Sequence, residues 1–225
     1  MQIPNVLFFD VAETLLDLAE PVGRVYTRFG KTAGLNLEEE MVTCHLRESF
    51  VGLPDPAPGG GDEAEVDWWR QLVRETFSRC GEEGAALCKS SEFETFFRTI
   101  FDFYASREAW TLYDDTLPAL EKARDASLRL GVISNFDDRL FPILDVMDLG
   151  DFFEVIVNSS GAGCRKPSTE IFHKACSLLE VEPESCLHIG DSLERDYKGA
   201  KNAGLQAHHL RRPSETLLDV LEQLI

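Results

Sequence analysis

The fold of this chain is decided by the stretch Val6-Leu7-Phe8-Phe9-Asp10-Val11-Ala12-Glu13-Thr14-Leu15-Leu16. Its first four residues are apolar, too few for a helix, and they end on the carboxylate of Asp10. A short continuous apolar run is typical of a strand that is covered on both faces of a parallel sheet. Open α/β sheets bind ligands at the carboxyl ends of such strands. Asp10 is therefore a candidate site residue, although an aspartate after a strand can also simply cap a turn.

Composition narrows the class of protein. The 225 residues are 44% hydrophobic and 28% charged, which predicts a packed globule. A formal net charge of −18 argues against nucleic-acid or anionic-membrane partners, because both attract Lys and Arg. The sequence has no signal-peptide pattern and no apolar run near the ~18 residues of a membrane span. Six cysteines without a CxxC pair, in a sequence without a signal-peptide pattern, indicate reduced thiols and a cytoplasmic protein. We also expect a monomer or a homodimer.

Residues 18–108 carry helical patterns and are predicted to form an all-helical insertion. Phe93, Phe96 and Phe97, for example, recur at the spacing of one buried helix face, which favours core packing over an aromatic ligand site. The segment 52–62 is rich in Gly and Pro and is predicted to hold neither helix nor strand.

Residues 109–225 alternate short apolar runs with helical patterns, as in a parallel sheet with crossover helices. Strands are predicted over 132–135, 154–157, 186–191 and 206–210. A helix over 118–130 is predicted to end at Gly131, and Ser214 is predicted to cap the last helix. The fold class is therefore α/β, with a Rossmann-like core formed by residues 1–17 and 109–225 and an inserted helical domain over 18–108.

Polar groups stand at the ends of these predicted strands. They are Asp10, Ser134-Asn135, the turn Arg165-Lys166-Pro167, and Gly190-Asp191 with Asp196 behind it. Because the carboxyl ends of parallel strands share one edge of a sheet, we expect the four groups to converge. Two nearby polar residues receive a structural interpretation: His188 as a core histidine, and Arg139 as part of a surface ion pair.

The chain resembles the haloacid dehalogenase-like (HAD) hydrolase superfamily over nearly its whole length. The resemblance is carried by Phe9-Asp10-Val11-Ala12-Glu13-Thr14-Leu15, Val132-Ile133-Ser134-Asn135-Phe136-Asp137, Lys166-Pro167 and Gly190-Asp191-Ser192-Leu193-Glu194-Arg195-Asp196. The segment around Ser134 looks most like the domain-containing-3 branch of that superfamily. The resemblance implies that the helical insertion is a cap domain.

The resemblance also implies a phosphatase-like chemistry on a small phosphorylated molecule. Asp10 would be the nucleophile. The other two catalytic residues would be Ser134, which holds phosphate oxygens, and Lys166, which neutralises charge on Asp10 and on the phosphoryl group. The ligands of a Mg²⁺ cofactor would be Asp10, the backbone carbonyl of Ala12, Asp191 and Asp196. Asp196 is alternatively expected to orient Lys166. The substrate-binding residues would be Thr14, Asn135 and Arg165, with Thr14 also fixing the loop after the nucleophile.

Ala12 departs from the pattern of the family. Phosphatase members carry an aspartate two residues after the nucleophile, where it protonates the leaving group and later activates water. Alanine can do neither, and we expect a one-residue offset to point the side chain of Glu13 elsewhere. Since general acid–base catalysis is worth about 10²–10⁴-fold, ordinary phosphomonoesterase activity is in doubt.

Three interpretations of Ala12 remain open. In the first, the chain is a phosphohydrolase in which Glu13 or a cap residue replaces the missing acid, or whose leaving group needs little protonation. Alternatively it hydrolyses a C–P bond, as in the phosphonoacetaldehyde hydrolase branch, which also has alanine at this position and uses a cap lysine. Residues 18–108 offer only Lys31 and Lys89 for that role. The third interpretation is a binding or scaffold protein that has lost turnover, because a fold does not guarantee a function.

Overall fold

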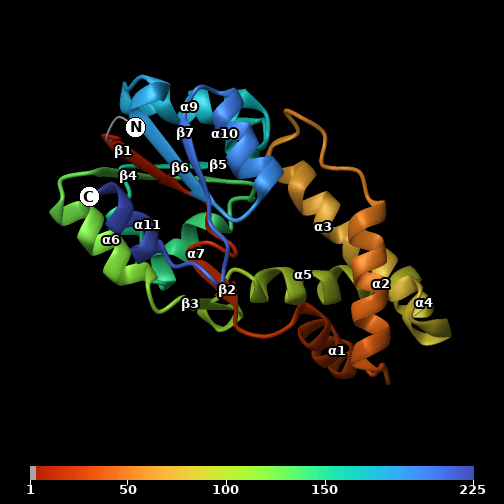
Figure 1. The fold of residues 1–225 in the computed structure, drawn as a ribbon. Coiled ribbons are helices and arrows are strands. Elements are labelled where there is room, and N and C mark those ends of the chain that lie inside the picture. Colours follow the sequence, from red (N-terminus) through yellow and green to blue (C-terminus); the bar gives the residue numbers. More distant parts are fainter. Residues whose placement is uncertain (1–3) are drawn as a thin grey trace. The chain divides into compact units, whose positions relative to one another are not determined.

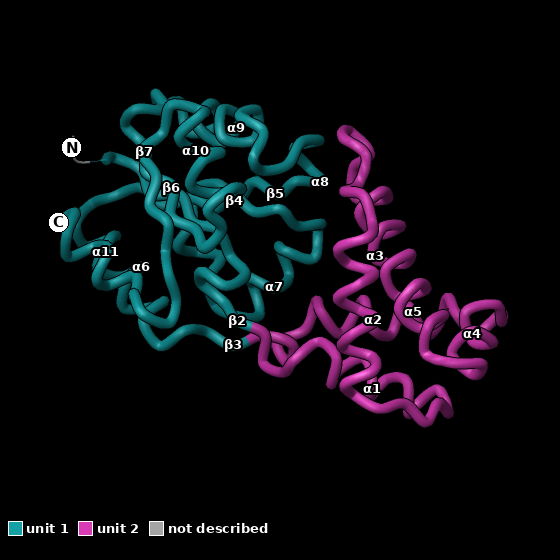
Figure 2. The backbone as a smooth tube through the Cα atoms, turned by 45° about the vertical axis from the view of Figure 1, so that its right-hand side comes forward, with its two compact units in different colours: residues 1–17, 111–225 teal, residues 18–110 magenta. Residues whose placement is uncertain are grey.

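The computed structural model describes residues 4–225 and divides into two compact units. The α/β unit consists of residues 1–17 and 111–225, and the helical unit of residues 18–110, drawn in teal and magenta in Figure 2. The chain passes between them at two short strands that pair with each other, β2 (Leu16–Leu18) and β3 (Trp110–Leu112). Over the described residues, no helix combines the length and the apolarity that crossing a bilayer requires.

The α/β unit is built on a sheet of five parallel strands in the order β5-β4-β1-β6-β7, which confirms the predicted fold class. The strands are β1 (Val6–Phe9), β4 (Arg129–Ser134), β5 (Val155–Asn158), β6 (Cys186–Gly190) and β7 (Gln206–His209). All four residues of the central strand β1 are fully buried, as its continuous apolar run predicts. Phe9 pairs with Val132 on one side and Ile189 on the other, so three strands end at the same edge.

Helices cover both faces of this sheet (Figure 1). One face carries α6 (Thr116–Asp125) and α11 (Leu217–Leu224), and the other carries α9 (Thr169–Leu179) and α10 (Gly199–Asn202). The remaining elements are α7 (Leu140–Val146), α8 (Ser159–Ala162), a π-helix η4 (Leu193–Lys198), and the 3₁₀ turns η2 (Gly150–Phe152) and η3 (Pro183–Ser185). The π-helix is notable because such turns are rare and are frequently found at functional sites.

Two predicted helix ends are wrong. Helix α6 ends at Asp125, and the chain turns through Ser127, whose φ of 60° is left-handed, before β4 begins. Gly131 lies inside β4, where an added Cβ would come within 2.8 Å of the ring of Phe8. The glycine therefore makes room for the neighbouring strand rather than ending a helix.

The last helix is capped by Thr216, not by Ser214. The Thr216 hydroxyl accepts a hydrogen bond from the backbone of Asp219 at 3.1 Å, and the Asp219 carboxylate accepts one from the backbone of Thr216 at 2.8 Å. This reciprocal arrangement is a capping box. The Ser214 hydroxyl instead donates to the carbonyl of Arg211 within the preceding turn.

The helical unit contains α1 (Val22–Thr32), α2 (Glu39–Gly52), α3 (Gly61–Ser78), α4 (Gly81–Lys89), α5 (Phe93–Phe103) and the 3₁₀ turn η1 (Arg107–Ala109). Its core is aromatic, with the Phe77 ring stacked on Tyr26 and edge-on to Phe96. The predicted buried face of α5 is confirmed. The irregular segment is shorter than predicted, because α2 runs to Gly52 and α3 already begins at Gly61.

Candidate active site

Three carboxylates converge at the carboxyl edge of the sheet. Asp10 follows β1, Asp191 follows β6, and Asp196 lies in η4. Each offers an oxygen, and these three oxygens all lie within 4.8 Å of one another. The in-register pairing of β1 with β6 produces this juxtaposition, because it aligns the residues that directly follow the two strands. The predicted acidic cluster therefore exists.

Gly190 explains how Asp196 reaches the strand. A Cβ at Gly190 would lie 2.3 Å from Cγ of Asp196, closer than real Cβ atoms come to any heavy atom. The backbone of Ser192 donates to Oδ2 of Asp196 at 2.9 Å, and the Ser192 hydroxyl caps the start of η4. Gly190 is thus required for the close approach of Asp196 to β6.

Lys166 links the first and third carboxylates. Its Nζ lies 2.9 Å from Oδ1 of Asp10 and 2.6 Å from Oδ1 of Asp196, and the side chain is buried. Burial disfavours the ammonium charge, but the charges of Asp10 and Asp196 outweigh burial and raise the pKa of Lys166. The lysine is therefore a fixed positive charge beside Asp10.

Asn135 holds the backbone of this lysine. Its side-chain Nδ2 donates to the Lys166 carbonyl at 2.9 Å, and its Oδ1 accepts from the Lys166 amide at 2.7 Å. A side chain engaged in this way fixes the turn that carries Lys166. This geometry favours a positioning role over the substrate contact that the resemblance implies.

Both carboxylate oxygens of Asp196 have hydrogen-bond partners within the protein. Oδ1 accepts from Lys166 and lies 2.9 Å from Nε2 of His188, and Oδ2 accepts from the Ser192 amide. Burial opposes its charge, yet the Lys166 ammonium and the His188 hydrogen bond hold the pKa of Asp196 well below its usual range. Of the two expectations for this residue, the contacts favour orientation of Lys166 over a direct bond to a metal ion.

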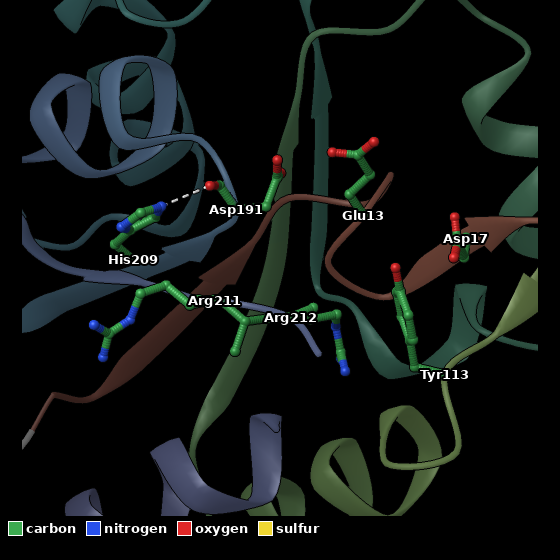
Figure 3. A pocket seen from close by; sticks show the side chains of 8 residues that line it. Glu13, Asp17, Tyr113, Asp191, His209, Arg211 and Arg212 are labelled. Carbon is green, nitrogen blue, oxygen red and sulfur yellow. Dashed lines mark hydrogen bonds between the residues drawn. The ribbon is translucent and has the colours of Figure 1, made fainter. Parts of the chain in front are cut away.

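Asp191 is the carboxylate with the weakest support from positive charge. Burial, followed by the charges of Asp10, Asp196 and Glu13, raises the pKa of Asp191 to about 7. The carbonyl of Asp191 accepts a hydrogen bond from Nε2 of His209 at 2.8 Å, drawn as a dashed line in Figure 3. A divalent cation would relieve this accumulation of negative charge.

Glu13 lies beside Asp191 (Figure 3). Its backbone is left-handed, with φ of 61°, a conformation that residues other than glycine adopt rarely. Both residues line a pocket of about 420 Å³ whose other lining residues are Asp17, Tyr113, His209, Leu210, Arg211 and Arg212. The expectation that Glu13 cannot take the place of an acid at position 12 stays a prediction.

Arg212 is a site residue that the sequence interpretation missed. Its Nε and Nη2 donate to the carbonyl of Thr14 at 3.1 and 2.7 Å, and its Nη1 pairs with Asp115 at 2.9 Å. The guanidinium also lies 3.7 Å from the ring centre of Tyr113. A pair of arginines directly after the last strand of a chain with a net charge of −18 was the available signal.

Arg212 holds the loop after Asp10 through the backbone of that loop. The Thr14 side chain is fully buried, and its hydroxyl has no hydrogen-bond partner among residues 4–225. The hydrogen bonds from Arg212 reach the Thr14 carbonyl and not its side chain, so the role expected of the Thr14 side chain stays a prediction. Ala12 is half-buried in the same turn and bridges to Leu16.

The segment after β4 contains a buried ion pair between Arg139 and Asp137. Ser134 ends the strand and is buried, and Arg139 contacts Asp137 with both Nε, at 2.8 Å, and Nη2, at 2.6 Å. Arg139 is only 9% exposed, so the predicted surface pair is wrong. Asp137 also accepts from the Arg139 backbone, and this local closure buries the pair. Arg165, next to Lys166, is half-buried.

Comparisons with known proteins agree with this geometry. A family model described as haloacid dehalogenase-like hydrolase matches residues 4–204. The chain is 32% identical to haloacid dehalogenase-like hydrolase domain-containing protein 3 of Bos taurus, over 93% of this chain and 82% of that protein. It is 33% identical to glyceraldehyde 3-phosphate phosphatase of Methanopyrus kandleri over 44% of this chain and 43% of that protein.

The fold is similar to solved structures as well. The HAD-hydrolase YfnB of Bacillus subtilis, solved with bound magnesium, superposes with a TM-score of 0.71 at 20% identity. The alignment covers 99% of this chain and 99% of that one. At this identity the likeness concerns the fold.

Proposed function

Because the chain belongs to the haloacid dehalogenase-like hydrolase family, we propose that it hydrolyses a small phosphorylated molecule through an aspartyl-phosphate at Asp10. One observation carries this function: a buried lysine contacts the carboxylate that ends the central strand, with Asp191 within reach of the same carboxylate. The similarity to a glyceraldehyde 3-phosphate phosphatase supports a phosphorylated metabolite as substrate. We further propose that the helical unit is the cap that selects it.

The donor set fits Mg²⁺, which prefers carboxylate, carbonyl and water oxygens in octahedral geometry. Asp10 and Asp191 supply carboxylate oxygens from adjacent strands, and the backbone carbonyl of Ala12 is a third candidate. The raised pKa of Asp191, about 7, supports a cation at this point, because burial and the neighbouring acids disfavour its charge. When bound, Mg²⁺ supplies positive charge that reduces the repulsion between Asp10 and a phosphate dianion.

The residues of the chain account for the two half-reactions. A carboxylate oxygen of Asp10 attacks phosphorus, and the bond from phosphorus to the leaving oxygen breaks. The ammonium of Lys166 neutralises charge on the transferred group, and the hydroxyl of Ser134 donates to one of its oxygens. Water then attacks phosphorus, which releases inorganic phosphate and restores the Asp10 carboxylate.

Ala12 determines which leaving groups suit this site. An alkoxide leaving group needs a proton, and Ala12 has none to give. An aryl or acyl leaving group departs without one. Glu13 is the nearest candidate for an alternative acid, since its carboxyl group lines the same pocket as Asp191. We therefore expect activated phosphate esters or anhydrides to be hydrolysed faster than alkyl phosphates.

The test compares the wild type with Asp10→Asn and Ala12→Asp on para-nitrophenyl phosphate and a panel of alkyl phosphates, with Mg²⁺. We expect aryl phosphate hydrolysis that Asp10→Asn abolishes, and a gain on alkyl phosphates in Ala12→Asp of up to about 10²-fold. No turnover and no Mg²⁺-dependent phosphate binding would instead identify a scaffold. Borohydride trapping of a lysine adduct with phosphonoacetaldehyde would identify a C–P hydrolase.

A further inference from the structure

We propose that His188 is a positioning residue for this reaction, holding Asp196 so that Asp196 fixes Lys166 against Asp10. The proposal rests on the proposed function, and it assigns a role to a buried histidine that the sequence interpretation treated as core. It does not depend on protonation of the histidine.

His188 is built into the middle of the sheet. It lies in β6 between Phe8 of β1 and Ala207 of β7, and it is fully buried. The Phe172 ring of α9 packs edge-on against the imidazole at 5.2 Å between ring centres. These contacts leave the imidazole little freedom to move.

The tautomer of His188 follows from its partner. Nε2 lies 2.9 Å from Oδ1 of Asp196, an ionised carboxylate that faces the Lys166 ammonium, so Nε2 carries the hydrogen and donates it. Burial lowers the pKa of His188, so the ring is neutral and Nδ1 carries a lone pair. Nδ1 has no hydrogen-bond partner within the described part of the chain.

A purely structural role does not account for this arrangement. A buried acceptor without a partner costs stability, and an apolar side chain at this position of an otherwise apolar strand would avoid that cost. What the histidine adds is one hydrogen bond to Asp196. The chain of contacts then runs from His188 to Asp196, from Asp196 to Lys166 at 2.6 Å, and from Lys166 to Asp10 at 2.9 Å.

The position of Lys166 depends on this chain of contacts because its Nζ is shared between two carboxylates. The hydrogen bonds from His188 and the Ser192 amide fix the two oxygens of Asp196 from outside the pair. Without the first of them the carboxylate can rotate, and the ammonium follows it. A displacement of the order of 1 Å in a catalytic group can cost about 10²-fold in rate.

The experiment compares His188→Leu, which removes the donor, with His188→Gln, which keeps one. His173→Phe is the control, because it removes a histidine of α9 that contacts the Ala203 carbonyl, away from Asp196. We expect His188→Leu to lower kcat on para-nitrophenyl phosphate by about 10- to 100-fold with KM within about twofold. We expect His188→Gln to recover most of kcat, and the thermal midpoint of all three variants to stay near that of the wild type.

Crystal structures of the wild type, His188→Leu and His188→Gln provide a readout that does not need turnover. We expect Nζ of Lys166 to leave Asp10 in His188→Leu and to stay in His188→Gln. The proposal is overturned if Lys166 keeps its place in His188→Leu, or if both variants lose kcat only in proportion to lost stability. A wild type that hydrolyses nothing overturns the proposed function alone, since the lysine position still decides the role of His188.

Discussion

In the α/β unit the buried side chains include several charged ones, whereas those of the helical unit are mostly apolar, many of them aromatic, with Glu65 as a buried acid. The buried acidic, basic and histidine residues of the α/β unit are Asp115, Asp137, Arg139, Lys166, His188 and Asp196. The buried aromatic residues of the helical unit are Tyr26, Phe77, Phe93, Phe96, Phe97, Phe101 and Trp110. Buried hydroxyls in the helical unit, such as Thr27 and Thr76, donate to a carbonyl one helical turn earlier.

The difference indicates what each unit is built for. Burying an ion is expensive, and a buried ion pair is rarely a net gain in stability over apolar packing. An aromatic core costs no such desolvation and supplies most of its stability through buried area. Charges retained inside the α/β unit near Asp10 therefore indicate a site, and the rings of the helical unit indicate packing.

Substitution of Lys166 by methionine is the strongest test of the claim that the buried charges of the α/β unit form a site. It leaves Asp196 and Asp10 without their shared cation, so we expect the free energy of unfolding to fall by about 3–5 kcal/mol. We expect kcat on an aryl phosphate to fall by about 10³-fold or more, because the positive charge beside the nucleophile is lost. Urea unfolding and steady-state kinetics measure the two effects.

Lys174→Met is the matched control for that substitution. Lys174 is exposed and donates to the Gly161 carbonyl on the surface of the α/β unit. We expect its removal to change the free energy of unfolding by no more than about 0.5 kcal/mol. Equal effects of the two substitutions would mean that the buried lysine has no special role.

Phe97→Ala tests the other half of the comparison. Phe97 is fully buried on α5 and contacts Phe101, so we expect a loss of about 3–5 kcal/mol in the free energy of unfolding. The affinity of the folded variant for Mg²⁺ should stay unchanged in isothermal titration calorimetry, since the proposed ligands lie in the α/β unit. Phe50→Ala, at a residue 44% exposed, should cost far less. A weakened Mg²⁺ affinity in Phe97→Ala would remove the distinction between the units.

The sequence predicts the sheet and the acidic cluster for identifiable reasons. The apolar run before Asp10 and the alternation after residue 109 are local patterns, and parallel pairing then aligns the strand ends. Asp10, Lys166, Asp191 and Asp196 meet because they directly follow strands or lie close behind them. No knowledge of long-range packing is needed for that inference.

Residues whose positions depend on long-range contacts cannot be predicted from such local patterns. Arg212 reaches Thr14 across nearly the whole sequence, and Arg139 is buried by a loop closure that no periodicity marks. The position of Glu13 depends on a left-handed backbone conformation that a glutamate rarely adopts. Gly131 looks like a helix stop, and only its contact with Phe8 on the neighbouring strand explains it.

A pH series tests whether the ionisation of Asp191 controls Mg²⁺ binding in the α/β unit. Since burial and neighbouring acids raise the pKa of Asp191 to about 7, the carboxyl is largely protonated below that pH without metal. Its contribution to folding stability is then fully present below its unfolded pKa and is lost as the pH rises through about 7. Mg²⁺ binding requires the ionised form, so we expect its affinity to rise about tenfold between pH 6 and pH 8. Calorimetry at both pH values measures this change, and Asp191→Asn should abolish the pH dependence along with most of the binding.

The smallest expected effect on stability distinguishes Thr216 from Ser214 as the residue whose hydroxyl caps α11. Thr216→Ala removes the capping hydroxyl of α11, so we expect a loss of about 1 kcal/mol in the free energy of unfolding. Ser214→Ala removes a hydroxyl that bonds only to the preceding turn, and should cost less than half as much. Both residues lie in the α/β unit but outside its buried charges, so neither variant should change Mg²⁺ affinity. If Ser214→Ala proves the more costly, the helix begins where its sequence pattern first indicated and the capping box at Thr216 does not hold it.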